Sequence, residues 1–433
     1  MIDAENGGAF SRLKSAVGSI GIPTWIIAGL WAIVLSAGYY KGISVETLLS
    51  DTIRRVGMNG VLVLAMVPAI QSGTGPNFAL PIGISCGLFA LITAIEFDYT
   101  GASWLIMSIL FSIPIAGVVG YLYGKLLNAV KGSEMTIATY TGFSIVAFMC
   151  LIWLVVPFSH PNMGWFMGEG LRETIQLDAI KGANVLNNFA IFNIGGEVVI
   201  PTSDDEKGQT FVITEIEKKT TTINIKEVEI PEVKGGGITP TFYIGDIKLP
   251  TVIGGKGIRI IKTDSTELPA VRRGITIPTG LLLVFAFFSV LVWLFFRSKA
   301  GIAISAGGLN PRFAQAAGLN IDRSRVWANI LSTMLGAIGI IIYSQSYGYA
   351  QLYQAPMMMA FPAVAAILIG GATASRAKIS HVVIGVILFQ GLLTTALPVT
   401  NALFEGTDLS EIARMVIQNG VILFALTQVK RGG

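Results

Sequence analysis

Polar side chains that could hydrogen-bond a solute recur inside the most apolar segments of the chain. They are Gln71, Ser72, Asn77, Tyr140, Thr141, Ser344, Gln345, Gln390, Thr394 and Thr395. For each of them, hydrogen bonding between neighbouring helices is the alternative explanation. Asn77 stands among glycines and prolines, which predict a broken helix of the kind tolerated where it lines a cavity. We therefore predict a substrate pathway at Gln71, Asn77 and Tyr140.

Side chains for covalent chemistry are scarce. The sequence has no GxxxxGK[ST] phosphate-binding loop, so the chain is not expected to hydrolyse ATP itself. Its two histidines, His160 and His381, are isolated, and Cys86 and Cys150 lie in apolar segments without the spacing of a metal site or a disulfide. We expect no catalytic residue, no metal and no cofactor.

Composition indicates an all-α polytopic membrane protein. Of 433 residues, 52% are hydrophobic and only 13% are charged, which is far more apolar than a soluble protein. The net charge of +4 comes without any basic run, so nucleic acid is not indicated as a partner. Within the apolar segments ionisable residues are rare, and Glu96 and Glu134 lie at segment ends, which argues against an ion-coupled carrier.

Ten apolar segments predict ten transmembrane helices. We place nine of them at residues 21–40, 57–70, 102–123, 135–156, 275–296, 326–347, 361–372, 381–397 and 415–427, and the third continues from the broken stretch 71–87 to residue 97. Met1–Ile20, before the first span, predicts an amphipathic surface helix or a disordered tail. Ser44–Arg55, before the second span, predicts an interfacial helix. Gly117, Gly120 and Gly124 predict close helix packing. An even number of spans places both termini on the same side of the membrane, and the loops rich in Lys and Arg make that side the cytoplasm.

Three regions follow from this pattern. Residues 1–158 form an N-terminal transmembrane region with spans one to five, and residues 274–433 form a C-terminal region with spans six to ten. Between them, residues 159–273 form a polar, extracytoplasmic insertion, for which we predict an amphipathic helix over Trp165–Asn187 and then a small β-rich part with strands in Phe211–Ile230. Matching Ala79-Leu80-Pro81 and Ala360-Phe361-Pro362 predict two inverted repeats.

The loop at residues 297–325 carries five cations against one acid, Asp322. Such an excess of Lys and Arg marks the cytoplasmic side. Within it, Asn310 can cap a short helix, Pro311 suits its first position and Gly318 can end it. The alternative is an ordinary loop with a capped helix and no docking role. On the cytoplasmic face, however, such a helix could dock a soluble motor.

The stretch FRSKAGIAISAGGLNPRFAQAAGLNIDRSRVWANILSTMLGAIG resembles the core of ATP-binding-cassette (ABC) importer permeases of the ribose/galactose and branched-chain amino acid types. The matching positions are Ala306, Gly308, Asn310, Pro311, Ala316, Ala317, Gly318, Asn320 and Arg323. Three further stretches match in order: SVETLLSDTIRRVGMNGVLVLAMVPAIQSG, GVVGYLYGKLLNAVKGSEMTIATYTGF and FPAVAAILIGGATASRAKISHVVIGVILFQGL. In the usual Gly-Ile-Asp-Leu-Ser-x-Gly motif this chain has Asn77 in the place of the acid, which leaves the substrate open.

The resemblance implies a non-enzymatic permease subunit that imports a small polar solute by alternating access. Its partners would be two cytoplasmic ATP-binding subunits or one fused double ATPase, an extracytoplasmic solute-binding protein, a second permease in a homo- or heterodimer, and the lipid bilayer of the bacterial cytoplasmic (inner) membrane. Coupling to the ATPase would use Asn310, Pro311, Arg312, Gln315 and Gly318.

By analogy we expect a simple sugar as the substrate, with a nucleoside or a flavin-type vitamin as alternatives. Two other functions stay open. One is a carrier or channel that works without an ATPase, and the other is a membrane anchor for an outer receptor or adhesion domain.

Overall fold

The computed structural model describes residues 21–156, 158, 160, 161, 163, 164, 171–189, 191–194, 197–200, 209–216, 223–225, 242–244, 247–249, 271, 272, 275–403, 415, 416, 419–424 and 427. The amphipathic helix predicted for Met1–Ile20 lies outside these residues. The described residues fall into two compact units. Ser44–Ser50 and the described part of Phe192–Ile277 form one unit, and the remaining described residues form the other.

Seven described helices are long and apolar enough to cross a membrane. They are α2 (Ile22–Tyr40), α3 (Val45–Leu64) with α4 (Met66–Gln71), α6 (Gly101–Ala129), α7 (Glu134–Val155), α9 (Thr279–Arg297), α12 (Ile321–Tyr347) and α15 (Ile379–Leu403). Two other predicted spans are shorter apolar elements, namely α5 (Leu80–Glu96) and α13 (Gln354–Met358) with α14 (Ala360–Ile369). Of the tenth predicted span, 415–427, the structure describes residues 415, 416, 419–424 and 427, and all of these are helical. The chain is thus a multi-pass α-helical membrane protein.

Helix α3 differs from the sequence prediction of a separate interfacial helix at Ser44–Arg55. It runs without interruption from Val45 to Leu64. Gly57 and Gly60 lie inside this helix, where α9 packs against it. A Cβ at Gly57 would lie 2.6 Å from the Leu281 side chain, and a Cβ at Gly60 would lie 2.5 Å from the Phe285 ring. These two glycines serve packing between helices, so the helix continues through them.

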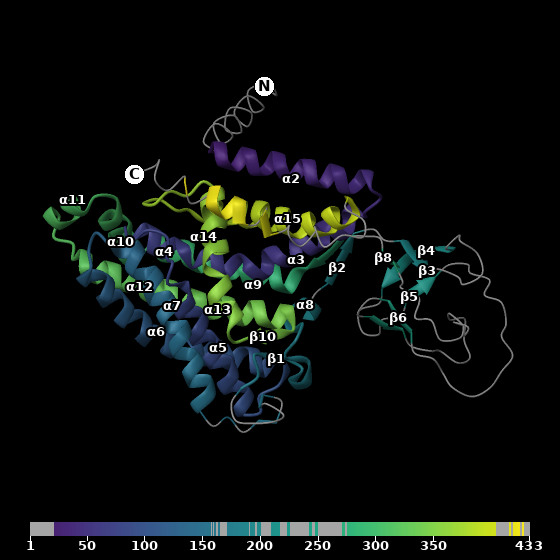
Figure 1. The fold of residues 1–433 in the computed structure, drawn as a ribbon, viewed down its shortest axis with the longest axis horizontal. Coiled ribbons are helices and arrows are strands. Elements are labelled where there is room, and N and C mark those ends of the chain that lie inside the picture. The colour runs from purple at the N-terminus through teal and green to yellow at the C-terminus, as the bar shows by residue number, and fades with distance from the viewer. Residues whose placement is uncertain are drawn as a thin grey trace, which may run out of the picture. The chain divides into compact units, whose positions relative to one another are not determined.

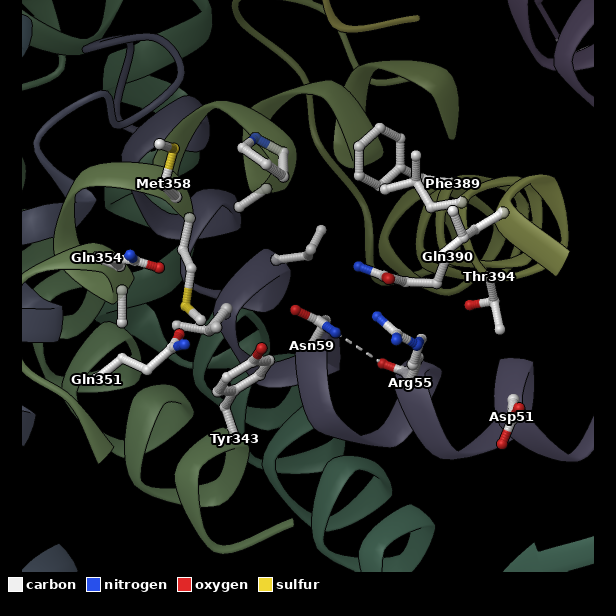
Figure 2. Close-up of a pocket in the computed structure, with 18 of the residues that line it drawn as sticks. Asp51, Arg55, Asn59, Tyr343, Gln351, Gln354, Met358, Phe389, Gln390 and Thr394 are labelled. Carbon is white, nitrogen blue, oxygen red and sulfur yellow. Dashed lines mark hydrogen bonds between the residues drawn. The ribbon is translucent and has the colours of Figure 1, made fainter. Parts of the chain in front are cut away.

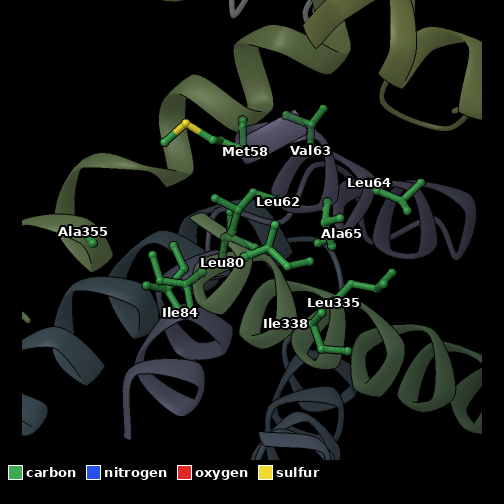
Figure 3. Close-up of a cluster of buried hydrophobic side chains, with 14 of the residues drawn as sticks. Met58, Leu62, Val63, Leu64, Ala65, Leu80, Ile84, Leu335, Ile338 and Ala355 are labelled. Carbon is green, nitrogen blue, oxygen red and sulfur yellow. The ribbon is translucent and has the colours of Figure 1, made fainter. Parts of the chain in front are cut away.

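The helix α12 is the centre of the packing in this unit. It packs against α5 and α6, and Figure 3 shows Leu335 and Ile338 of α12 in one buried cluster with Leu62 of α3 and Leu80 of α5. Small residues allow the close approach. A Cβ at Gly120 or Gly124 of α6 would lie 2.9 Å from a Cα of α12, and one at Gly117 would lie 2.9 Å from the Met334 side chain. The predicted role is confirmed for Gly120 and Gly124, which face backbone atoms, whereas Gly117 faces the flexible end of a side chain.

The predicted break after span two is present between α4 and α5. Gly73 and Gly75 adopt φ values of +76° and +80°, which strain residues with a Cβ, and α5 then begins at Leu80. In Figure 1 α4, α10 (Lys299–Leu309) and α14 lie near one another, and residue contacts join α4 to both of the others. Both halves of the predicted repeat motif start a helix, α5 at Leu80 and α14 at Ala360.

The helix predicted over Trp165–Asn187 is not what the structure shows in its described part, residues 171–187. Strand β1 (Thr174–Gln176) pairs antiparallel with β10 (Tyr349–Gln351), followed by a 3₁₀ turn at Asp178–Ile180 and by α8 (Val185–Phe189). Buried Leu171 and Ile175 have helical spacing, but Ile175 and Leu177 also alternate as in a strand. The pairing with β10 decides between the two patterns.

The second unit contains most of the described strands. A four-stranded sheet has the order β5 (Ile223–Ile225), β4 (Gln209–Ile216), β3 (Glu197–Ile200) and β8 (Val271–Arg272). Two pairs accompany it, β6 (Phe242–Ile244) with β7 (Ile247–Leu249), and β2 (Ile191–Ile194) with β9 (Ile275–Pro278). Strands β4 and β5 lie in or next to the segment for which strands were predicted.

Candidate functional site

A cavity of about 370 Å³ opens between α3, α15 and the 351–363 segment, with Tyr343 of α12 at its edge. This volume is within the range of pockets that bind small molecules. Its polar lining groups are four amides, two hydroxyls and one ion of each sign. They are Asn59, Gln351, Gln354, Gln390, Tyr343, Thr394, Asp51 and Arg55. Leu62, Val63, Met358 and Phe389 contribute apolar walls, so the cavity offers both hydrogen bonds and an apolar surface.

Two buried polar side chains of α15 lie in this cavity without partners. Gln390 is 6% exposed and makes no hydrogen bond to the described residues, and the buried Oγ1 of Thr394 also has no partner there. Figure 2 shows both side chains projecting from α15 toward the side of α3 that carries Asn59 and Arg55. Leaving the buried Thr394 hydroxyl unsatisfied costs about 1–3 kcal/mol, so this group indicates a ligand or a functional need.

The two charged residues of the cavity, Asp51 and Arg55, are both exposed and lie one turn apart on α3. They therefore share one face of the helix. The Asn59 side chain lies one turn further along this face, and its amide donates to the Arg55 carbonyl over 3.0 Å. The charged end of the cavity is thus electrically balanced, and its deeper lining is neutral.

Asn77 does not line this cavity. Its amide nitrogen donates to the Ser332 hydroxyl over 2.8 Å, and its oxygen accepts from the Ala79 backbone N–H at 3.0 Å and from the Tyr123 hydroxyl at 3.2 Å. The side chain is 4% exposed. Both polar atoms of the side chain therefore hold the helix break against α6 and α12. This is the hydrogen bonding between helices that was the alternative to a pathway role.

The other two predicted pathway residues are also outside the cavity. Tyr140 is 67% exposed on the outer face of α7, away from the cavity-lining residues. Gln71, at the end of α4, accepts from Ser305 of α10 over 2.6 Å and donates to the carbonyl of Ala377 over 2.7 Å. The structure therefore does not bring Gln71, Asn77 and Tyr140 together around a solute.

The predicted capped helix in the 297–325 loop is present as α11 (Pro311–Ala316). The Asn310 side chain accepts from the Phe313 N–H over 3.1 Å, Pro311 is the first residue, and Gly318 follows with φ +81°. Arg312 and Gln315 are exposed, while only Ala314 of α11 is buried. All five predicted coupling residues thus lie on one exposed turn that follows α10.

The sequence prediction missed an aromatic residue on this turn. Phe313 is 70% exposed, and Leu309 beside it is 52% exposed. Large exposed apolar side chains are enriched in protein interfaces. A phenylalanine inside an otherwise basic and small-residue loop is the signal that could have identified it. The cavity itself was partly foreseen, since Gln390 and Thr394 were among the polar residues noted in apolar segments.

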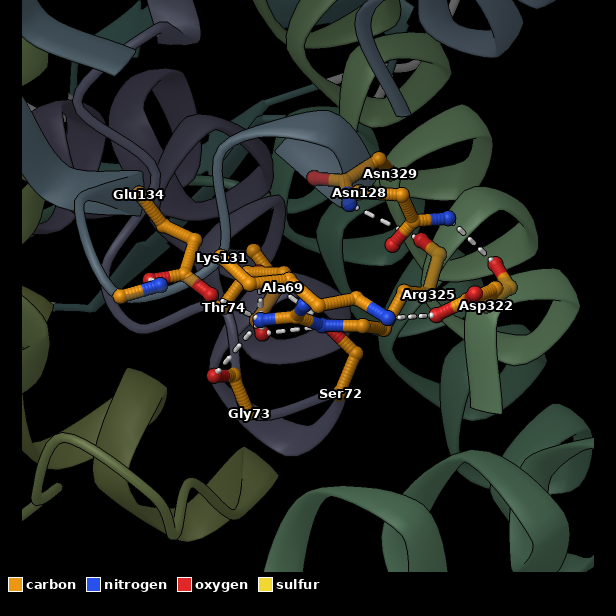
Figure 4. Close-up of polar contacts among 11 residues, drawn as sticks. Ala69, Ser72, Gly73, Thr74, Asn128, Lys131, Glu134, Asp322, Arg325 and Asn329 are labelled. Carbon is orange, nitrogen blue, oxygen red and sulfur yellow. Dashed lines mark hydrogen bonds and ion pairs between the residues drawn. The ribbon is translucent and has the colours of Figure 1, made fainter. Parts of the chain in front are cut away.

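An ion pair joins α12 to the start of α7. Arg325 pairs with Glu134, with side chains 9% and 16% exposed, and the Arg325 guanidinium also lies 3.5 Å from the carbonyl of Gly73 in the helix break. Beside it, Lys131 pairs with exposed Asp322 over 2.6 Å (Figure 4). A buried pair of this kind is costly to break by removing one partner, so it fixes the break region against α7 and α12.

Among the described residues no group of three or more His, Cys, Asp or Glu is placed to hold a metal ion. The cavity side chains can bind a solute by hydrogen bonds and apolar contact, and α11 presents a surface for another protein.

Comparison with known proteins supplies the family. The profile of the family described as "Branched-chain amino acid transport system / permease component" matches residues 48–426. No curated protein and no solved structure matches the chain. The matched range includes the cavity, the helix break and the α10–α11 segment. The chain belongs to the branched-chain amino acid transport system permease component family.

Proposed function

We propose that the chain is the transmembrane permease subunit of an ABC importer that moves a small polar solute into the cytoplasm by alternating access. The observation that carries this proposal is the cavity in the membrane unit, where Gln390 and the buried hydroxyl of Thr394 make no hydrogen bond to the described residues. A solute in the cavity would supply the hydrogen bonds that these groups lack. The family makes ATP-binding subunits and a solute-binding protein its partners, and the exposed α11 is the docking surface we assign to the ATPase.

A simple sugar is the first candidate substrate. Each sugar hydroxyl both donates and accepts, as do the amides of Asn59, Gln351, Gln354 and Gln390 around the cavity. The mixed apolar and hydrogen-bonding lining also suits a nucleoside or a flavin-type vitamin.

A branched-chain amino acid is a second candidate, favoured by a specific observation. Asp51 and Arg55 present one negative and one positive charge on the same face of α3, which complements the ammonium and carboxylate groups of a zwitterion. Leu62, Val63 and Phe389 would then face its apolar side chain.

Uptake in the native cells tests the function and separates these substrates. Cells lacking the chain, and cells with it restored, are given radiolabelled D-ribose, L-leucine, uridine or riboflavin. We expect the deletion to abolish uptake of one of these solutes, and depletion of ATP to abolish it in the restored cells. Uptake that survives ATP depletion but not a protonophore would establish the ATPase-independent carrier instead.

A further inference from the structure

Gln71 joins three elements through its one side chain. Its oxygen accepts from the Ser305 hydroxyl of α10, and its nitrogen donates to the carbonyl of Ala377, while its own backbone ends α4 at the helix break. Both bonds span more than 230 residues of sequence. The side chain is partly buried, and both polar atoms of its amide are used.

The backbone makes the same junction tight. Gly308 of α10 lies so close to the carbonyl of Gln71 and the N–H of Gly73 that a Cβ on Gly308 would collide with both. In the same way, a Cβ added at Gly73 would lie 3.0 Å from the Cα of Gly308. The end of α10 therefore cannot move toward the helix break without displacing Gln71.

On its other side Gln71 is bonded to the base of α15. Ala377 is 3% exposed and lies two residues before Ile379, where α15 begins. The helix α15 carries Gln390 and Thr394, the two unpartnered groups of the cavity. One amide thus connects the segment that ends in the exposed α11 with the helix that lines the cavity.

We propose that Gln71 is a positioning residue for energy coupling: it transmits displacement of α10 to α15 and so changes the width of the cavity. This inference rests on the proposed function, because it presupposes an ATPase acting on α11. It replaces the pathway role that the sequence predicted for Gln71. Hydrogen-bond networks that join elements with two discrete arrangements can carry coupling between distant sites.

The test measures cavity accessibility in the complex of the chain with the ATP-binding subunits that co-purify with it. A single cysteine replaces exposed Met358 at the cavity, in a Cys86→Ala, Cys150→Ala background, and its rate of reaction with a maleimide is compared without nucleotide and with ATP and vanadate. With Gln71 present, we expect nucleotide to change the rate by about fivefold or more.

Gln71→Leu is expected to abolish this response while ATP hydrolysis continues. Ser305→Ala removes one hydroxyl only, and we expect it to reduce the response; this variant decides the matter if Gln71→Leu fails to assemble. Combining the two should add nothing to the loss in Gln71→Leu, because both changes break the same connection.

Matched controls are Gln176→Leu at an exposed position of β1 and Ser324→Ala, whose hydroxyl donates to the carbonyl of Asn320. Both should respond like the parent. A full response in Gln71→Leu or in Ser305→Ala would overturn the role of Gln71 and leave the proposed function standing. No co-purifying ATPase, or no nucleotide response in the parent, would instead overturn the proposed function and this inference with it.

Discussion

At the scale of single residues, the orphaned hydroxyl of Thr394 distinguishes binding from stability. This hydroxyl has no partner among the described residues, so removing it costs no hydrogen bond to them. Removing it from a binding site does cost the bond that a ligand makes with it. A substitution here should therefore affect uptake without affecting folding.

We predict that Thr394→Val raises the KM for uptake of the transported solute about fivefold, the effect of one lost neutral hydrogen bond. Thermal stability of the purified chain should stay the same or rise. The control is Thr395→Val, since Thr395 is fully buried and its hydroxyl bonds the carbonyl of Gly391 in its own helix. An unchanged KM in Thr394→Val would remove this residue from the solute cavity.

Asn77 should show the opposite behaviour. In Asn77→Leu the N–H of Ala79 and the hydroxyl of Tyr123 lose their acceptor, and about 1–3 kcal/mol of stability is lost for each buried group left unpaired. We predict a lower Tm in detergent with an unchanged KM for uptake. Asn401→Leu, at an exposed position, provides the matched control. A raised KM with an unaltered Tm would return Asn77 to the pathway.

At the scale of elements, local signals in the sequence predicted what local physics decides. The cap at Asn310, the stop at Gly318 and the close packing of Gly120 and Gly124 depend on one residue and its immediate neighbours, and the structure has all of them. Where two patterns compete, a partner far along the chain decides. Strand β1 forms because Tyr349–Gln351 pairs with it, and this partner lies far outside the 171–187 segment.

The same distinction explains the site. Which polar residues line a cavity depends on which of them find partners inside the protein. Asn77 and Gln71 find theirs at Ser332, Ser305 and Ala377, whereas Gln390 and Thr394 find none among the residues that the structure describes. The sequence could nominate all four as polar residues in apolar segments. It could not assign these partners of Asn77 and Gln71, which lie between 234 and 306 residues away along the chain.

The short helix α11 gives a prediction at this scale. Phe313→Ala removes the largest exposed apolar side chain of α11, and we expect less ATP-binding subunit to co-purify with the chain. Arg312→Ala and Gln315→Ala should weaken the association in the same direction. The control is Phe97→Ala at the end of α5, which is similarly exposed and outside this loop. Full association in the Phe313 and Arg312 variants would move the docking surface elsewhere.

At the scale of the whole molecule, the open question is whether the membrane unit transports without the strand-rich insertion. Described residues in the first part of the insertion are hydrogen-bonded to α3 and α12 of the membrane unit. Asn187 bonds the Ser346 hydroxyl over 2.9 Å, and Arg54 donates to the side chain of Asn184 and to the carbonyl of Ser346. A deletion that starts at Asn187 would break these bonds, so a test of the insertion must begin after them.

The pairing of β3 with β8 shows where to cut. Val199 lies opposite Val271 and Val198 opposite Arg272, so a two-residue Asn-Gly turn in place of residues 201–269 can join the two strands as a hairpin. We predict that this shortened chain still binds the ATP-binding subunits and still supports uptake in the native cells, because the cavity, Gln71 and α11 all lie in the other unit. Retained uptake would make the insertion accessory and remove the receptor alternative. If uptake is lost while the ATPase still associates, a step of transport requires residues 201–269, and docking of the solute-binding protein is the step that an extracytoplasmic segment could perform.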